Sequence, residues 1–275
     1  AMEISESVER LPGRRGQGQS LDKVLLPMKF SEYLDFVEPN FKTILFNHGL
    51  KKAKDRHDKF NKIMSGEIPN ELEKIMQYKK FLDDMLNDYL ISGGIPSVIN
   101  EHKVKGEISN GTFITYYNGL MGDFKKIGLK DDYVKQIVRG LIETYRSPIS
   151  WNALTKKTEL GSHNTIDRYT EGFGKLFFAN KVFHINQNAE PEFSKDKKVY
   201  FQDPFFFNLF CANNSNPENF YNTIKLSLLN NDHVSSLAET ITYNHLCRLA
   251  YQFRPNDLFQ PTEHIFYHRT AKDKE

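Results

Sequence analysis

Residues 131–177 read DDYVKQIVRGLIETYRSPISWNALTKKTELGSHNTIDRYTEGFGKLF, and this stretch decides the fold. Its opening aspartates, Asp131 and Asp132, suit the positive end of a helix dipole. Apolar residues then recur at helical spacing along one face: Val134, Ile137, Val138, Leu141, Ile142 and Tyr145. Farther along, Ser150 and Ser162 are each placed to cap another helix. The stretch therefore predicts three short helices in succession.

Two strand-like runs follow the third predicted helix. They span residues 181–186 and 197–202, and a loop that contains Pro191 joins them. Three helices followed by a two-stranded wing make the winged form of the helix-turn-helix, in which the third helix can enter the major groove of DNA. The sequence therefore predicts a winged helix over residues 131–203.

The third helix and the wing carry the candidate DNA-binding residues, all of them polar or basic: His163, Asn164, Thr165, Arg168, Lys175, Lys195, Lys197 and Lys198. Asn164 could read adenine, and Arg168 could read guanine or grip a phosphate. Asp167 and Glu171 share the helix face, however, and would repel phosphates. The pattern leaves two alternatives open, a surface for DNA or a surface that packs against protein, and the wing lysines favour DNA.

Helical patterns also precede this segment. Residues 71–91 have the helical period, Gly93 and Gly94 stop that helix, and a further helix follows Ser109. Residues 46–70 are locally basic and predict a solvated helix or a loop rather than a binding patch. The predicted fold is mainly α with small β elements (α+β): a helical bundle, a winged helix and a partial α/β tail.

Short apolar runs near the two ends of the chain predict strands. Residues 23–28 are typical of a buried strand, which precedes a helix capped by Ser31, and residues 264–269 predict an edge strand. A lone strand is not stable without neighbours, and no partner is evident for either run. The pattern therefore predicts that the chain is a fragment of a larger protein.

The segment after the wing predicts a core and two helices. A dense run of phenylalanines at residues 205–210 predicts buried packing, and helices are expected over residues 217–230 and 233–253. Between them Asp232, His233 and Ser235 suggest a catalytic set. Residues so close in sequence rarely form a triad, so we expect them to cap a helix instead.

Composition excludes several classes of protein. The 275 residues include 37 Lys and Arg against 35 Asp and Glu, which argues against a strongly basic nucleic-acid coat and leaves only local patches. The two cysteines form no CxxC pair, so no zinc site is evident. Because no apolar run approaches the roughly 20 residues of a spanning helix, and no signal-peptide core is present, we expect a cytoplasmic protein without a membrane partner.

Several motifs together resemble AAA+ ATPases of archaea and bacteria whose role is unknown. They are SVERLPGRRG at residues 7–16, LLPMKFSEYL at 25–34, YLISGGIP at 89–96, KVYFQDP at 198–204 and HIFYHR at 264–269. The resemblance covers nearly the whole chain. It implies a remnant of the ATPase core at residues 1–45, a helical lid at 46–130, the winged helix at 131–203, and a truncated nuclease-like domain at 204–275.

The same resemblance implies roles for individual residues. Arg14 or Arg15 would lie at a subunit interface of a homo-oligomer and act as an arginine finger. Glu239 matches the first acidic metal position of the nuclease-like domain, and Glu275 lies where the next acidic strand would start, so no metal site is complete. ATP and Mg²⁺ are implied for the parent protein. This chain lacks a Gly-rich phosphate-binding loop, so we expect no cofactor and no ATP hydrolysis without the missing ATPase core.

The function predicted from the sequence is therefore that of the C-terminal part of an AAA+ ATPase, whose winged helix binds DNA or couples subunits. Two alternatives remain. One is a winged-helix DNA-binding regulator without an ATPase partner, although such a regulator has no use for a strand at residues 23–28. The other is a non-enzymatic protein-interaction module, which the mixed charge of the third helix favours.

Overall fold

A computed structural model describes residues 25–50, 56–145, 147–215, 218–253 and 263–269 of the chain. Its elements, in chain order, are α2 (Phe30–Val37), α3 (Pro39–Asn47), α4 (Arg56–Met64), α5 (Asn70–Ile75), the 3-10 helix η2 (Met76–Tyr78), α6 (Lys79–Ser92), α7 (Pro96–Lys105), α8 (Asn110–Lys126), α9 (Asp131–Glu143), α10 (Trp151–Lys157), α11 (His163–Lys175), β1 (Ala179–Ile185), β2 (Pro191–Glu192), β3 (Lys198–Phe201), α12 (Pro204–Asn214), α13 (Phe220–Ser227), α14 (Asn231–Phe253) and β4 (Phe266–Tyr267). The predicted class, mainly α with small β elements, is confirmed.

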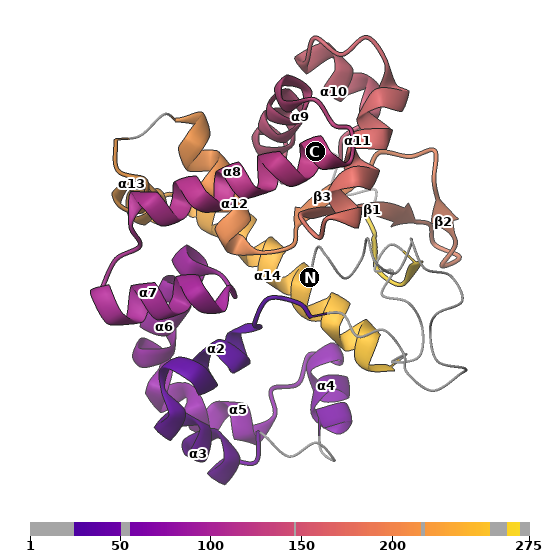
Figure 1. The fold of residues 1–275 in the computed structure, drawn as a ribbon. Coiled ribbons are helices and arrows are strands. Elements are labelled where there is room, and N and C mark those ends of the chain that lie inside the picture. The colour runs from indigo at the N-terminus through magenta and orange to yellow at the C-terminus, as the bar shows by residue number, and fades with distance from the viewer. Residues whose placement is uncertain (1–24, 51–55, 146, 216–217, 254–262, 270–275) are drawn as a thin grey trace, which may run out of the picture.

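The segment that decides the fold forms the elements its sequence predicts. The Ser150 hydroxyl caps α10 by accepting from the Ala153 amide at 3.0 Å, and Ser162 caps α11 by accepting from the Asn164 amide at 3.2 Å. β1 and β3 then pair antiparallel, with Asn180 opposite Tyr200. A single bridge between Ile149 and Lys197 adds to the sheet. Helices α9, α10 and α11 followed by this hairpin have the order of a winged helix (Figure 1).

The expectation of an unpaired edge strand near the C-terminal end is wrong. β4 lies parallel to β1, with Phe266 opposite Phe183 and Tyr267 opposite His184. Its partner is thus a strand of the wing, about 80 residues earlier in the sequence. A pairing over that distance leaves no local signal in the sequence, because it depends on how the intervening helices pack.

The strand expected at residues 23–28 is also not formed over the residues described. Residues 25–29 have no regular secondary structure, and Leu25 is 76% exposed. Helix α2 begins at Phe30, so Ser31 lies inside the helix and does not cap it. The Glu32 carboxylate accepts from the Lys29 amide at 3.1 Å and supplies the N-terminal contact instead.

Helix α12 occupies the centre of the molecule. Among its residues, Pro204–Phe210 and Ala212 are all buried, as the phenylalanine run predicts. It packs against α6, α8, α9, α13 and α14, and in Figure 1 it lies between the lower helices and the winged segment. Buried residues from Tyr33 to Cys247 form a continuous cluster. The predicted boundaries at residues 45, 130 and 203 stay predictions, and the segments on either side of the last two share this core.

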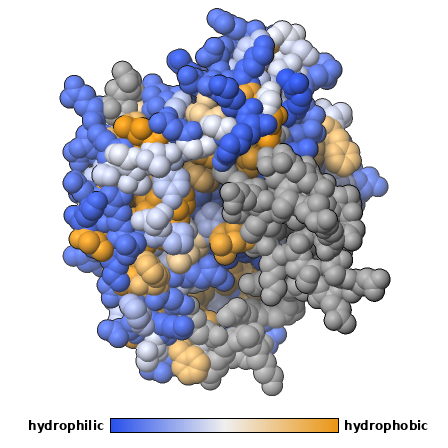
Figure 2. All heavy atoms as spheres, viewed as in Figure 1, coloured by the Kyte–Doolittle hydropathy of each residue, from blue (hydrophilic) through white to orange (hydrophobic). Residues whose placement is uncertain are grey.

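Most described residues on the face shown in Figure 2 are hydrophilic. Figure 2 shows apolar residues as separate spots on the face in view. Within the described residues, no helix is both long and apolar enough to cross a membrane.

Candidate nucleic-acid interface

Helix α11 presents most of the predicted DNA-binding residues to solvent. His163, Asn164, Arg168 and Lys175 are exposed, and Thr165 is half-buried at the helix start. The opposite face packs into the core through Ile166, Tyr169 and Phe173. The Arg168 guanidinium lies 5.5 Å from the centre of the Tyr169 ring. The structure thus gathers the five predicted helix residues along the outer side of one element.

The two carboxylates on α11 are engaged by a lysine of the wing. The Lys181 ammonium lies 2.9 Å from Asp167 and 3.2 Å from Glu171, and the Trp151 indole N–H donates to Asp167 at 2.9 Å. Burial acts to raise the pKa of Asp167, but the hydrogen bonds from Lys181 and Trp151 outweigh it and lower that pKa. Lys181 therefore partly neutralises the two carboxylates that, from the sequence pattern, are expected to repel phosphates. The sequence pattern carries no signal for Lys181, which lies on a different element.

The predicted wing lysines are not equivalent. Lys195 is exposed, whereas the Lys197 ammonium lies 5.7 Å from the Trp151 ring centre, and burial lowers its pKa. The Lys198 ammonium forms an ion pair with Glu239 at 3.0 Å, and only 17% of its side chain is exposed. Lys198 thus joins the base of the wing to α14, and Lys195 is the most accessible of the three.

The Glu239 carboxylate of α14 binds two side chains of β3 in the wing. Besides Lys198, its carboxylate accepts from the Tyr200 hydroxyl at 3.0 Å. Burial, followed by the charge of Glu239, raises the pKa of Tyr200. No group of three or more His, Cys, Asp or Glu that could hold a metal exists in the described part of the chain. Arg14, Arg15 and Glu275 lie outside the described residues.

Three of the resembling motifs meet at one junction beneath the winged segment. The Met28 amide donates to the Gly94 carbonyl at 2.7 Å, and the Tyr89 hydroxyl donates to the Met28 carbonyl at 2.8 Å. The Gly94 amide donates to Asp203 at 2.8 Å, and Asp203 also caps α12 by accepting from the Phe205 amide at 2.8 Å. The motifs at residues 25–34, 89–96 and 198–204 are thus joined directly, although they are far apart in sequence.

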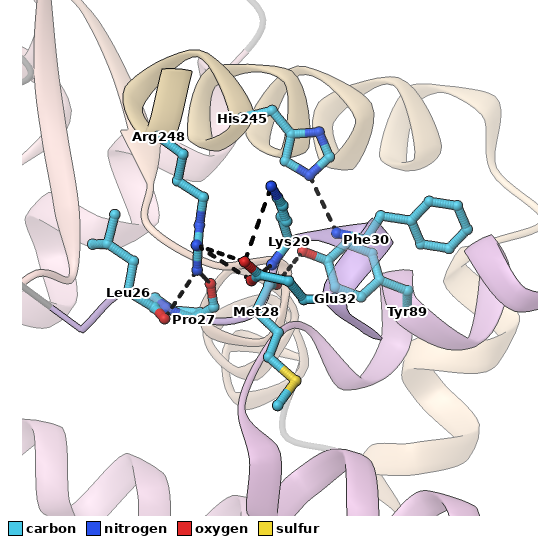
Figure 3. Close-up of polar contacts among 9 residues, drawn as sticks. All are labelled: Leu26, Pro27, Met28, Lys29, Phe30, Glu32, Tyr89, His245 and Arg248. Carbon is cyan, nitrogen blue, oxygen red and sulfur yellow. Dashed lines mark hydrogen bonds and ion pairs between the residues drawn. The ribbon is translucent and has the colours of Figure 1, made fainter. Parts of the chain in front are cut away.

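Helix α14 holds the N-terminal side of this junction (Figure 3). Arg248 donates to the carbonyls of Leu26 and Pro27, and it pairs with Glu32 at 3.2 Å. The His245 ring accepts from the Phe30 amide at 3.3 Å. Burial lowers the pKa of His245, which keeps the ring neutral and able to accept. Residues 25–32 are therefore attached to α14 on one side and to the α6–α7 turn on the other.

The His233 ring of the suggested catalytic set bonds Asn208 of α12. The buried Asn208 amide donates to the Leu90 carbonyl at 2.7 Å, so its oxygen accepts from the His233 ring at 2.9 Å. Burial lowers the pKa of His233 to about 4, and the neutral ring serves as a fixed donor. The Asn230 side chain accepts from the Asp232 amide at 2.8 Å at the start of α14. Capping is thus present, as expected, but Asn230 provides it.

Comparison with known proteins adds one result. No curated protein and no solved structure matches the chain. Residues 83–218, which run from within α6 through the winged segment and past α12, match a domain family described as a domain of unknown function (DUF8612). The chain is therefore similar to that family over the region that contains both α11 and two of the three motifs of the junction.

Proposed function

We propose that this chain is the DNA-contacting part of an AAA+-type ATPase, and that α11 and the wing meet duplex DNA. The observation that carries the proposal is the outer side of α11. Asn164, Arg168 and Lys175 are exposed there, and Lys181 pairs with both Asp167 and Glu171 and so partly neutralises them. A helix with donors at its exposed start and partly neutralised acids behind it suits a negatively charged groove.

The relation to an ATPase is supported by the junction. Residues 25–32 precede the winged segment in sequence, yet they are bonded to Gly94 and to Arg248, and Gly94 is bonded in turn to Asp203 at the end of the wing. A displacement of a domain joined before residue 25 would therefore be transmitted to α12 and the wing through these hydrogen bonds. The geometry supports coupling as well as DNA contact.

The residues present do not fit a nucleotide–magnesium site. The sequence contains no phosphate-binding loop of the Gly-x₄-Gly-Lys-Ser/Thr type, and the described residues hold no cluster of metal-binding side chains. ATP binding would thus belong to another part of the assembly, and no chemical step is assigned to this chain.

DNA binding is testable with fluorescence anisotropy of a labelled duplex over about 50 to 200 mM salt. Arg168→Ala should weaken affinity by about tenfold, and it should reduce the slope of log affinity against log salt by about 1 if Arg168 contacts phosphate. Asn164→Ala should narrow the affinity difference between duplexes of different sequence, because a bidentate amide contact specifies adenine.

Lys80→Ala is the matched control. Lys80 is exposed on α6, remote from α11, and its loss removes the same charge from the chain. We expect it to retain wild-type affinity. Equal losses for Lys80→Ala and Arg168→Ala would indicate a non-specific charge effect, and the absence of binding by the wild type at low salt would refute the proposal.

One observation favours the second candidate, a protein-interaction module. Met64, Ile68 and Met76 are 71%, 68% and 60% exposed around α4, α5 and η2, although they are apolar. If this surface associates with a second copy, sedimentation velocity should show a concentration-dependent dimer that Met64→Lys abolishes. A monomer at all concentrations would contradict self-association.

A further inference from the structure

Residues 263–269, which we call the strap, lie along the wing. β4 within the strap adds to β1 in parallel register, while β2 and β3 pair with β1 as antiparallel strands. The wing thus receives a strand from the far end of the described chain.

The wing has two arms: β1, and the chain from β2 to β3. The strap forms hydrogen bonds with both. The Tyr267 hydroxyl donates to the Asp196 carbonyl at 2.5 Å, on the arm that leads into β3. The His268 Nδ1 lies 3.0 Å from the Ile185 carbonyl at the end of β1, and it must donate because a carbonyl only accepts. Two neighbouring side chains therefore connect the strap to both arms.

Packing around His184 reinforces these bonds. The ring of Tyr267 lies 5.3 Å from the His184 ring and that of His268 lies 5.9 Å from it, measured between ring centres. His184 is also bonded through Nδ1 to Glu192 on the second arm at 2.8 Å. The strap thus covers the side chain that links the two arms near the tip.

The tip of the wing is closed by a turn, in which the Asn186 amide donates to the Glu190 carbonyl at 3.0 Å, but its ladder is short. β2 pairs with β1 over two residues only, His184 with Glu192 and Ile185 with Pro191. Residues 193–196 then leave the sheet before Lys197 bridges Ile149 and β3 begins, and Phe193 is 63% exposed. A hairpin with so short a ladder is marginally stable alone, so a third strand at its edge has a large effect on where the wing lies.

We propose that Tyr267 and His268 are positioning residues, through which the strap holds the wing in the orientation that contacts DNA. The effect of the strap on DNA affinity rests on the proposed function, whereas its hold on the wing does not. Displacement of the strap would loosen the outer part of the wing, including Lys195, and leave α11 in place. DNA affinity would then depend on the position of the chain that follows α14.

The test combines hydrogen exchange with DNA affinity in the full chain. The double variant Tyr267→Phe/His268→Ala removes both hydrogen bonds and preserves the ring of Tyr267. Exchange of amides in residues 183–198 should become about tenfold faster, because two hydrogen bonds that hold the wing closed are lost. Exchange in α9 should not change, and affinity for the duplex should fall about threefold or more.

Tyr116→Phe is the matched control, because the Tyr116 hydroxyl bonds Ser97 at 2.6 Å far from the wing. It should change neither readout. Unchanged wing exchange in the double variant would overturn the positioning role, and faster exchange with unchanged affinity would overturn its link to DNA. If the wild type binds no DNA, the proposed function fails by itself, and wing exchange alone then decides whether the strap positions the wing.

Discussion

Replacing Gly94 with alanine should destabilise the folded chain by about 4 kcal/mol, the upper end of single substitutions. A Cβ at this position would lie 2.1 Å from the Met28 carbonyl oxygen and 2.6 Å from the Met28 nitrogen. Both are backbone atoms, so no side-chain rotation can relieve the overlap. A shift of the backbone that relieved the overlap would break the hydrogen bonds that Gly94 makes with Met28 and Asp203. Urea denaturation followed by circular dichroism measures the change.

Gly119→Ala provides the control for that measurement. Gly119 lies in α8, and nothing would approach its Cβ within 4 Å. Alanine there should raise the free energy of unfolding by about 1 kcal/mol, because glycine is the poorer helix former. A Gly94→Ala chain as stable as the wild type would show that residues 25–29 do not lie against the α6–α7 turn.

Asp203 should make the chain less stable as pH rises from about 4 to 7. Burial raises the pKa of this carboxyl from 3.8 to about 7, against the opposing hydrogen bonds from Gly94 and Phe205 and the charge of Arg248. The folded state therefore holds the proton more tightly than the unfolded state. Its contribution is complete below about pH 4 and is lost through pH 7. At 1.36 kcal/mol per pKa unit the difference amounts to about 4 kcal/mol.

Asp203→Asn separates this effect from other titrations. An amide does not ionise, so the loss of stability that Asp203 causes between about pH 4 and 7 should disappear. The amide nitrogen would also replace one of the two acceptor oxygens opposite Gly94 and Phe205, which should cost about 2 kcal/mol at pH 5. Variant and wild type should therefore converge in stability near pH 8. Parallel curves for the two proteins, measured by urea denaturation at pH 5, 7 and 8, would contradict the assignment.

Buried histidines do not confuse the comparison. Burial lowers the pKa of His233 to about 4 and also lowers that of His245. A histidine that is neutral when folded loses stability as pH falls below about 6.5, where the unfolded ring gains a proton. That change has the opposite sign and overlaps the Asp203 window between about pH 4 and 6.5. Wild type and Asp203→Asn share these histidines, so the difference in stability between the two proteins reports on Asp203 from about pH 4 to 7.

Local signals were sufficient to predict much of the fold. Ser150 and Ser162 cap α10 and α11 because a hydroxyl beside the first helical amides is a short-range contact. The glycine pair that ends α6 is equally local, since Gly93 has a φ of +63° that other residues rarely adopt. Where the responsible contacts lie within a few residues, the sequence pattern identified the elements.

The errors concern contacts between distant segments. The apolar neighbours of Met28 predict a strand, but its backbone bonds the Gly94 turn and Tyr89 of α6. The partner of β4 was missed because β1 lies far away in the sequence. Likewise, the charge balance of α11 depends on Lys181 from the wing, and the role of Lys198 depends on Glu239 of α14. Composition and periodicity contain no information about such pairs.

The central position of α12 has a consequence for synthesis on the ribosome. Residues 204–214 pack against α6, α8 and α9, which are made before them, and these helices cannot complete their packing until α12 exists. At 5–20 residues per second the interval from residue 33 to residue 214 lasts roughly 10 to 40 s. During that time the nascent chain exposes apolar surface that would engage a chaperone. Synthesis of α12, followed by that of α13 and α14, which also pack against it, therefore completes the burial of this surface.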